Sequence, residues 1–232
     1  MIDKSRFLAN CNALSITAES YVDALDKYAE ILTEYNTKVN LTAIIDAEGI
    51  ENKHFTDSLL LAKQPEIQGK LVDVGTGAGF PGVVVKLANP QIDLTLMEPT
   101  GKRVEFLKYL CSELNIKASI IKERAEEAAR KVWRESFDVA TARAVANMSA
   151  LCEYCLPLLK VGGVFIAMKS DASQELEDAM PAIEKLGGEY MRTESFVLPN
   201  GERRTLIFVK KISQTPSVYP RNGGKIAKAP LK

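Results

Sequence analysis

The segment from residue 73 to residue 82, Asp-Val-Gly-Thr-Gly-Ala-Gly-Phe-Pro-Gly, constrains the fold of this chain more than any other feature. A short apolar run leads into Asp73, and an apolar stretch rich in valine follows Pro81. Glycine permits a sharp turn and the close approach of a ligand, and proline fits the first turn of a helix. The pattern therefore predicts a strand, a glycine-rich loop and a helix N-terminus, the part of an open α/β sheet that holds a nucleotide-like cofactor.

Two kinds of cofactor fit this loop. Gly77, Gly79 and Gly82 match the dinucleotide pattern G-x-G-x-x-G, and Glu98 follows at about 20 residues, the distance expected for a ribose-binding acid. However, Asp73 and Gly75 precede that triplet, and acid-x-Gly-x-Gly-x-Gly is similar to the first motif of S-adenosylmethionine (SAM) methyltransferases. An acid suits the ammonium group of SAM but repels a dinucleotide phosphate, so we favour SAM over NAD. The expected cofactor residues are then Asp73, Gly75, Thr76, Gly77 and Gly79 in the loop, with Glu98 on the ribose.

The pattern of apolar residues predicts three parts. Residues 1–69 are expected to form an N-terminal helical cap, with an amphipathic helix over 21–35, a break at 36–42 and a second helical stretch over 50–61. Residues 70–212 are expected to form a methyltransferase domain, and 213–232 a basic tail.

Short β-rich runs alternate with helical ones after residue 70, which predicts parallel strands joined by helices. The expected strands are 71–75, 93–98, 118–122, 137–141 and 164–169, with helices beginning near residues 81, 101, 124, 147 and 173. Two further runs, 189–198 and 204–211, have no helix between them and are expected to form an antiparallel hairpin. The predicted fold is α/β, a Rossmann-like SAM methyltransferase sheet that is mostly parallel with its last strand antiparallel.

Charge is distributed unevenly although the chain has 30 basic and 30 acidic residues. Eight Lys and Arg residues and no acid stand between Arg203 and Lys232, so the rest of the chain is acidic. A cationic end on an acidic body suits contact with phosphate, as in RNA. The alternative is a tail that its charges merely keep solvated.

Other features restrict the class of protein. No apolar run approaches the roughly 20 residues that span a bilayer, and the N-terminus lacks the layout of a signal peptide, so we expect a cytoplasmic protein with reduced thiols. Cys152 and Cys155 form a single C-x-x-C without a second pair. No metal site is therefore expected, and the two cysteines are read as small residues on a helix face.

The residues near the carboxyl ends of the strands are the candidates for chemistry. They include Ala125 and Glu126 after the third predicted strand, Arg143 after the fourth and Lys169 at the end of the fifth. The chain has neither the Asp/Asn-Pro-Pro-aromatic element of enzymes that methylate adenine amines nor a Pro-Cys pair for pyrimidine carbon-5. What remains is an acceptor with a free lone pair, such as guanine N7, or a hydroxyl or amine activated in another way.

Catalysis on guanine N7 would consist mainly of positioning. Arg143, Lys169 and Arg203 would then hold phosphates or the base rather than move protons. His54 is the one histidine, and we expect an orienting or packing role for it because this reaction needs no general base.

Several motifs together resemble one family, the bacterial 16S rRNA guanine-N7 methyltransferases known as RsmG or glucose-inhibited division protein B. They are Asn40-Leu-Thr-Ala, Lys53-His-Phe-Thr-Asp-Ser-Leu, the loop at 73–82, Gly101-Lys-Arg-Val-Glu-Phe-Leu, Arg124-Ala-Glu-Glu, Ala142-Arg-Ala and Gly201-Glu-Arg. The resemblance runs from about residue 34 to the C-terminus.

This resemblance implies a SAM-dependent enzyme that methylates N7 of one guanosine in the decoding-region loop of 16S rRNA. We expect it to act as a monomer on rRNA in the small subunit or an assembly intermediate. It implies that Gly75, Phe80, Ala125, Glu126 and Arg143 contact SAM, that Glu98 is the ribose acid, and that Lys169 and Arg203 surround the RNA pocket. The alternatives are a SAM methyltransferase for a small molecule or protein, an NAD-dependent oxidoreductase and a non-catalytic RNA-binding protein.

Overall fold

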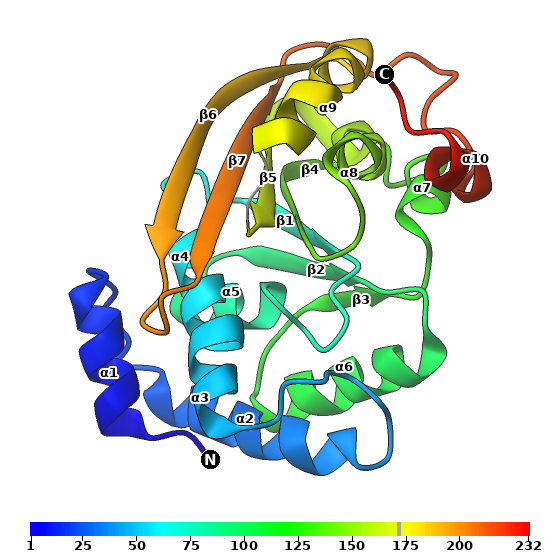
Figure 1. Ribbon diagram of the computed structural model, residues 1–232. Coiled ribbons are helices and arrows are strands. Elements are labelled where there is room, and N and C mark those ends of the chain that lie inside the picture. Colours follow the sequence, from blue (N-terminus) through cyan, green and yellow to red (C-terminus); the bar gives the residue numbers. More distant parts are fainter. Residues whose placement is uncertain (171–172) are drawn as a thin grey trace.

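A seven-stranded sheet forms the centre of the part of the chain that the computed structural model describes, residues 1–170 and 173–232 (Figure 1). Its strand order is β3-β2-β1-β4-β5-β7-β6. The strands are β1 (Lys70–Val74), β2 (Asp93–Met97), β3 (Ser119–Ile121), β4 (Phe137–Arg143), β5 (Leu159–Lys169), β6 (Gly188–Val197) and β7 (Arg203–Lys211).

Strand direction confirms the predicted fold class. Strands β1 to β5 are parallel to their neighbours, whereas β7 is antiparallel to both β5 and β6, so β6 and β7 form the expected hairpin. Asp73 on the central strand β1 lies between Leu96 of β2 and Thr141 of β4. The glycine loop therefore starts in the middle of the sheet.

Helices cover both faces of the sheet (Figure 1). One face is covered by α1 (Lys4–Ala13), α2 (Val22–Asn36), the π-helix η1 (Ile50–Thr56), α4 (Asp57–Ala62), α5 (Gly82–Ala88) and α6 (Gly101–Glu113), with α3 (Ala47–Gly49) leading into η1. The other face is covered by α7 (Ala125–Ala128), α8 (Met148–Cys155), the 3-10 turn η2 (Leu156–Leu158) and α9 (Ser173–Lys185), and α10 (Gly223–Lys228) packs on α8.

Side chains of the central strands alternate between the two apolar cores. On β5, Val164, Ile166 and Met168 join the core under the N-terminal helices, while Phe165 and Ala167 join the core under α8 and α9. This period of two follows from the pleat of a strand, and it places both faces of residues 164–168 out of water. Cys152 and Cys155 of α8 are buried in the second core.

Several predicted boundaries were wrong. The helical stretch predicted over 50–61 is present, as the π-helix η1 followed by α4, but other boundaries differ. Strand β5 begins at Leu159 rather than at residue 164, because Leu159 pairs with Phe137 before a register shift. Strand β4 continues to Arg143, which is thus the last residue of the strand. The helix expected near residue 124 is the single turn α7.

The C-terminal tail packs on the body of the protein instead of extending from it. Leu231 belongs to the core under α8 and α9, and Ile226 of the unpredicted helix α10 is buried. Figure 1 shows the tail running beside α7 and α8. Among the residues described here, no helix combines the length and apolar character that crossing a membrane requires.

Candidate active site

Asp73 anchors the glycine loop to the centre of the sheet. Its Oδ2 accepts a hydrogen bond of 2.6 Å from the Thr76 hydroxyl and one of 2.8 Å from the Gly82 amide. The backbone has positive φ at Gly75, Gly77 and Gly79, a conformation that glycine adopts without strain. A Cβ at Gly79 would lie 2.6 Å from the Tyr28 hydroxyl, so this glycine is also needed for packing.

The second oxygen of Asp73, Oδ1, is buried and has no hydrogen-bond partner among the described residues. Burial raises the pKa of Asp73 to about 6, although the bonds from Thr76 and Gly82 favour the charged form. A buried carboxylate oxygen without a donor is costly. The loop is thus built around a negative charge that an additional donor or cation would stabilise.

Glu98 follows β2 directly and connects the loop to that strand. Its Oε2 accepts from the Gly77 amide at 3.1 Å and its Oε1 from the Thr100 amide at 2.8 Å. The side chain is buried, with Arg103 at 3.8 Å. Each carboxylate oxygen has a further lone pair, so Glu98 retains the capacity to accept from a hydroxyl.

A cavity of about 190 Å³, called here the loop cavity, lies beside the start of the glycine loop. Its walls come from the ends of β1 and β2 and from the segments after β3 and β4. They are formed by Val74, Gly75, Met97, Pro99, Glu123, Arg124, Ala125, Glu126, Val145 and Tyr154. Of the predicted cofactor residues, the structure brings Gly75, Ala125 and Glu126 together in this wall.

A larger cavity of about 530 Å³, called here the basic cavity, lies on the other side of the turn after β4. It is lined by Ile44, Lys53, His54, Asp57, Arg143, Ala144, Met168, Lys169, Ser170, Glu175, Glu202 and Arg204. Arg143 and Ala144 line this cavity while the next residue, Val145, lines the loop cavity. The two cavities are therefore separated by a single turn, in which Ala144 has the strained φ of +56°.

Arg143 is held by the π-helix η1. Its Nη1 donates to the Lys53 carbonyl at 2.8 Å and to Asp57 Oδ2 at 2.9 Å. Its guanidinium also lies 5.2 Å from the centre of the Phe80 ring, a cation–π distance. The side chains of both Arg143 and Asp57 are largely buried, so this ion pair fixes the position of the guanidinium.

His54 completes the support of Arg143. Its Nδ1 lies 3.3 Å from Arg143 Nη2, and its Nε2 lies 3.2 Å from the Thr42 hydroxyl. Because a guanidinium can only donate, Nδ1 is the accepting nitrogen and Nε2 carries the proton. Burial and the Arg143 charge lower the pKa of His54 to about 3, so the ring is neutral.

Three stacked rings connect His54 to the glycine loop. The His54 ring stacks on Phe80 at 4.4 Å, and Phe80 stacks on Tyr28 at 4.9 Å. The Tyr28 hydroxyl donates to the carbonyl of Ala78. Phe80, which was predicted to contact the cofactor, is thus enclosed between the cap and the loop.

Lys169 and Arg204 supply further charge to the basic cavity. Lys169 Nζ donates to the Ala146 carbonyl at 2.9 Å and pairs with Glu175 at 2.6 Å. Arg204 Nε lies 3.4 Å from Asp57 Oδ1. Arg203, the residue singled out from the sequence, is exposed and does not line the cavity. Three residues of the cavity wall were not predicted from the sequence: Lys53, Asp57 and Arg204.

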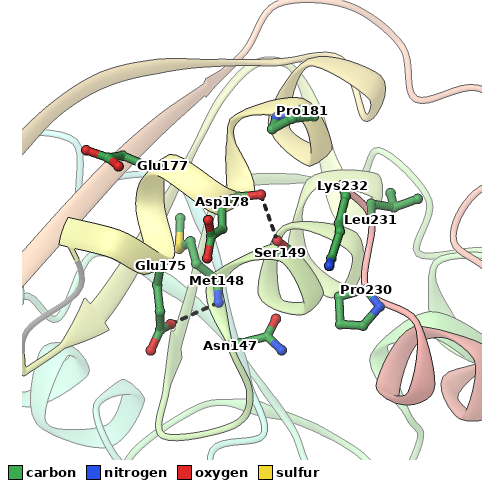
Figure 2. Close-up of a pocket in the computed structure, with 10 residues that line it drawn as sticks. All are labelled: Asn147, Met148, Ser149, Glu175, Glu177, Asp178, Pro181, Pro230, Leu231 and Lys232. Carbon is green, nitrogen blue, oxygen red and sulfur yellow. Dashed lines mark hydrogen bonds between the residues drawn. The ribbon is translucent and has the colours of Figure 1, made fainter.

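A third cavity, of about 380 Å³, lies between the first turns of α8 and α9 and the end of the tail, and shares Glu175 with the wall of the basic cavity (Figure 2). Glu175 accepts from the Met148 amide, and Ser149 donates to the Asp178 carbonyl, so the two helices are joined at its edge. None of the predicted site residues lines it. Within residues 1–170 and 173–232, no group of three or more His, Cys, Asp and Glu is arranged to hold a metal ion.

Comparison with known proteins assigns the chain to a family. The family model of GidB, rRNA small subunit methyltransferase G, matches residues 22–206. Ribosomal RNA small subunit methyltransferase G of Alkaliphilus oremlandii is 45% identical over 92% of each chain, and that of Lachnoclostridium phytofermentans is 43% identical over 100% of this chain and 98% of its own.

Solved structures agree on the fold. A SAM-dependent O-methyltransferase from Thermotoga maritima superposes with a TM-score of 0.52 at 14% identity, over 80% of this chain and 72% of its own. The resemblance inferred from the motifs is therefore confirmed: the chain belongs to the rRNA small subunit methyltransferase G (GidB) family of SAM-dependent enzymes.

Proposed function

We propose that this protein transfers a methyl group from SAM to N7 of a guanosine in the decoding-region loop of 16S rRNA. The observation that carries the proposal, beside the family, is the pair of cavities separated by the turn at Arg143. One adjoins a glycine loop with a buried acid, and the other is lined by several cations. The protein acts as a cytoplasmic monomer on the small subunit or on an assembly intermediate.

The loop cavity is the proposed cofactor site. SAM, when bound, supplies a methyl group on a sulfonium cation, and its amino-acid part carries an ammonium group. The buried Oδ1 of Asp73 fits such a cationic ligand because nothing in the described structure compensates that oxygen. The proposed cofactor residues are Asp73, Gly75, Thr76, Gly77, Gly79, Phe80, Glu98, Ala125, Glu126 and Arg143. Thr76 and Phe80 act through the shape of the loop, and Asp73 acts both through its bonds to the loop and through its free Oδ1. Gly75, Ala125 and Glu126 line the cavity.

The basic cavity is the proposed substrate site. Its wall carries four cations, Lys53, Arg143, Lys169 and Arg204, against three carboxylates, Asp57, Glu175 and Glu202. The cations outnumber the acids by one, and their N–H groups are donors suited to the phosphates of RNA. Lys169 and Arg143 are already fixed by carboxylates, so they present ordered donors to the nucleotide. Arg203, exposed at the start of β7, is proposed to contact RNA outside the cavity.

A lone-pair acceptor agrees with the protonation state of this site. His54 is the one histidine, its Nδ1 faces Arg143, and its pKa of about 3 leaves it a very weak base. Guanine N7 exposes its lone pair on the base edge and requires no deprotonation. Positioning that nitrogen in line with the methyl group is then the main contribution of the protein.

The test is to incubate the purified protein with 30S subunits and SAM carrying a labelled methyl group, and to cleave the rRNA chemically at N7-methylguanosine. A single cleavage in the decoding-region loop is the expected result. Label in the RNA without cleavage would refute N7 as the acceptor. Protein-free 16S rRNA and assembly intermediates are assayed in parallel, and absence of label from all three substrates would refute the RNA substrate.

A further inference from the structure

The tail after β7 is fastened to the protein by two arginines of the segment after α7. The Arg134 guanidinium donates to the carbonyls of Thr215 and Tyr219, at 2.5 and 2.9 Å, and Arg130 Nε donates to the Pro220 carbonyl at 2.9 Å. The end of the tail is fixed as well, since Leu231 packs beside α8 and α9 (Figure 2). The path of the tail past α7 and α8 is therefore fixed along its length.

Arg221 fastens the tail to α8 by an ion pair with a fully buried partner. Its amide donates to Glu153 at 2.7 Å, and its guanidinium reaches the two oxygens of that carboxylate at 2.6 to 3.1 Å. The Glu153 side chain is 0% exposed, and Arg221 of the tail is its ion-pair partner. Without Arg221, the buried carboxylate would lose the positive charge that compensates it. The neighbouring residue on α8, Tyr154, lines the loop cavity.

Helix α10 makes direct contact with a second residue of that cavity. A Cβ built on Gly223 would lie 2.1 Å from Oε1 of Glu126, a separation at which atoms overlap. Glu126 is 5% exposed, because the backbone of α10 covers its side chain from outside. A side chain at the first residue of α10 would therefore displace the Glu126 carboxylate, the end of a flexible side chain, from its place beside the loop cavity.

From these contacts we infer that the C-terminal tail is a positioning element of the cofactor site. Arg221 holds the tail against α8 beside Tyr154, and Gly223 sets the position of Glu126. The inference rests on the proposed function of the loop cavity and goes beyond the family match, which ends at residue 206. A tail that only bound phosphate or improved solubility would have no effect on SAM affinity.

Two neighbouring glycines provide a matched pair of variants. Gly223→Ala introduces a methyl group against Glu126, whereas Gly224→Ala meets nothing closer than Asn222 Oδ1 at 3.7 Å. Each substitution replaces glycine by alanine in the first turn of α10, so the two variants raise the helix propensity of this turn alike. Calorimetric titration with SAM is expected to show a dissociation constant raised at least tenfold in Gly223→Ala and changed less than twofold in Gly224→Ala, with thermal unfolding close to wild type in both.

A double-mutant cycle with Glu126→Ala separates positioning from a general structural effect. Removing the Glu126 side chain opens the space that the new methyl group needs, so Gly223→Ala should then cost no further SAM affinity. Equal SAM affinity of the two glycine variants, or a Gly223→Ala effect that persists without Glu126, would overturn the inference. Failure of the wild-type protein to bind SAM would refute the proposed function instead.

Discussion

Replacing Asp73 by Asn should remove part of the pH dependence of the stability of the SAM-free protein. The folded-state pKa of about 6 lies above the ordinary value of 3.8, so the folded protein binds more protons than the unfolded chain between these values. The stabilisation that Asp73 contributes is therefore complete below pH 3.8 and is lost as the pH rises through 6. Asn keeps an oxygen for the Thr76 and Gly82 bonds but has no charge to bury.

The size of the effect follows from the two pKa values. At about 1.4 kcal/mol per pKa unit, the penalty for ionising Asp73 in the folded protein is about 1 kcal/mol at pH 4.5 and about 3 kcal/mol at pH 7.5. The stability difference between Asp73→Asn and wild type should thus shift by about 2 kcal/mol in favour of the variant between these two pH values.

Urea unfolding of both proteins at pH 4.5 and pH 7.5 measures this difference. The comparison between variant and wild type is necessary because His54 acts in the opposite direction over the same range: its lowered pKa destabilises the folded state as the pH falls below 6.5. The His54 contribution is common to both proteins and cancels. A stability difference that stays constant with pH would refute the raised pKa of Asp73.

SAM binding provides a second measurement on the same pair of proteins. If a cationic ligand supplies the missing partner of Asp73 Oδ1, binding favours the charged carboxylate, and wild-type affinity should rise about tenfold from pH 5 to pH 7. Asp73→Asn should bind more weakly and lose this rise. An identical pH dependence of SAM affinity in the two proteins would mean that the ligand does not reach Asp73.

Three further substitutions test the neighbouring groups. Arg143→Lys cannot reproduce the bonds to Lys53, Asp57 and His54. Calorimetry should therefore show weaker SAM binding, and the free energy of unfolding should fall by about 2–4 kcal/mol. Unchanged SAM affinity would limit Arg143 to a structural role. His54→Gln should remove the acid destabilisation that His54 contributes, about 2 kcal/mol between pH 6.5 and 4.5. Urea unfolding that shows the same acid loss in variant and wild type would contradict the lowered pKa. Lys169→Met should weaken RNA binding and reduce the slope of log affinity against log salt concentration by about one unit. The control Lys160→Met, in an exposed surface pair with Asp138, should change neither. Equal salt slopes for the two variants would exclude a phosphate contact at Lys169.

The features that depend on neighbours in the sequence were predictable. Asp73, the glycines and Pro81 determine a strand, turn and helix within ten residues, and the β6–β7 hairpin follows from two β-rich runs without a helix between them. The family could be inferred because its motifs are such local segments. Element ends were less predictable, since β4 and β5 are extended by pairing with each other rather than by their own residue preferences.

The choice of Arg203 over Arg204 shows how a strand residue can be placed on the wrong face. In β7, Leu206 and Phe208 lie in the core under the N-terminal helices. Arg204 precedes them by two and four residues, so its side chain lies on the same face of the strand. A period of two therefore directs Arg204 toward Asp57 and turns Arg203 away. The sequence did not carry this signal, because residues 206–209 are a continuous apolar run that is buried on both faces of β7.

The tail could not be read from the sequence in the same way. Its positive charge suggested a phosphate partner, but Arg221 is neutralised by Glu153, which stands 68 residues earlier in the chain. The contact of Gly223 with Glu126 also joins distant segments, and a glycine at the start of a short basic helix gives no sign of what lies beside it. Only the tertiary arrangement shows that these residues meet.

The neutral histidine links the structure of the cap to the chemistry of the site. A protonated His54 would place a second cation 3.3 Å from the Arg143 guanidinium, in a buried ring stacked on Phe80. A neutral His54 thus accepts from Arg143 and supports the guanidinium that Asp57 holds, and a ring with so low a pKa is a poor general base. The arrangement favours an acceptor atom that already has its lone pair, and guanine N7 meets that requirement whereas a hydroxyl does not.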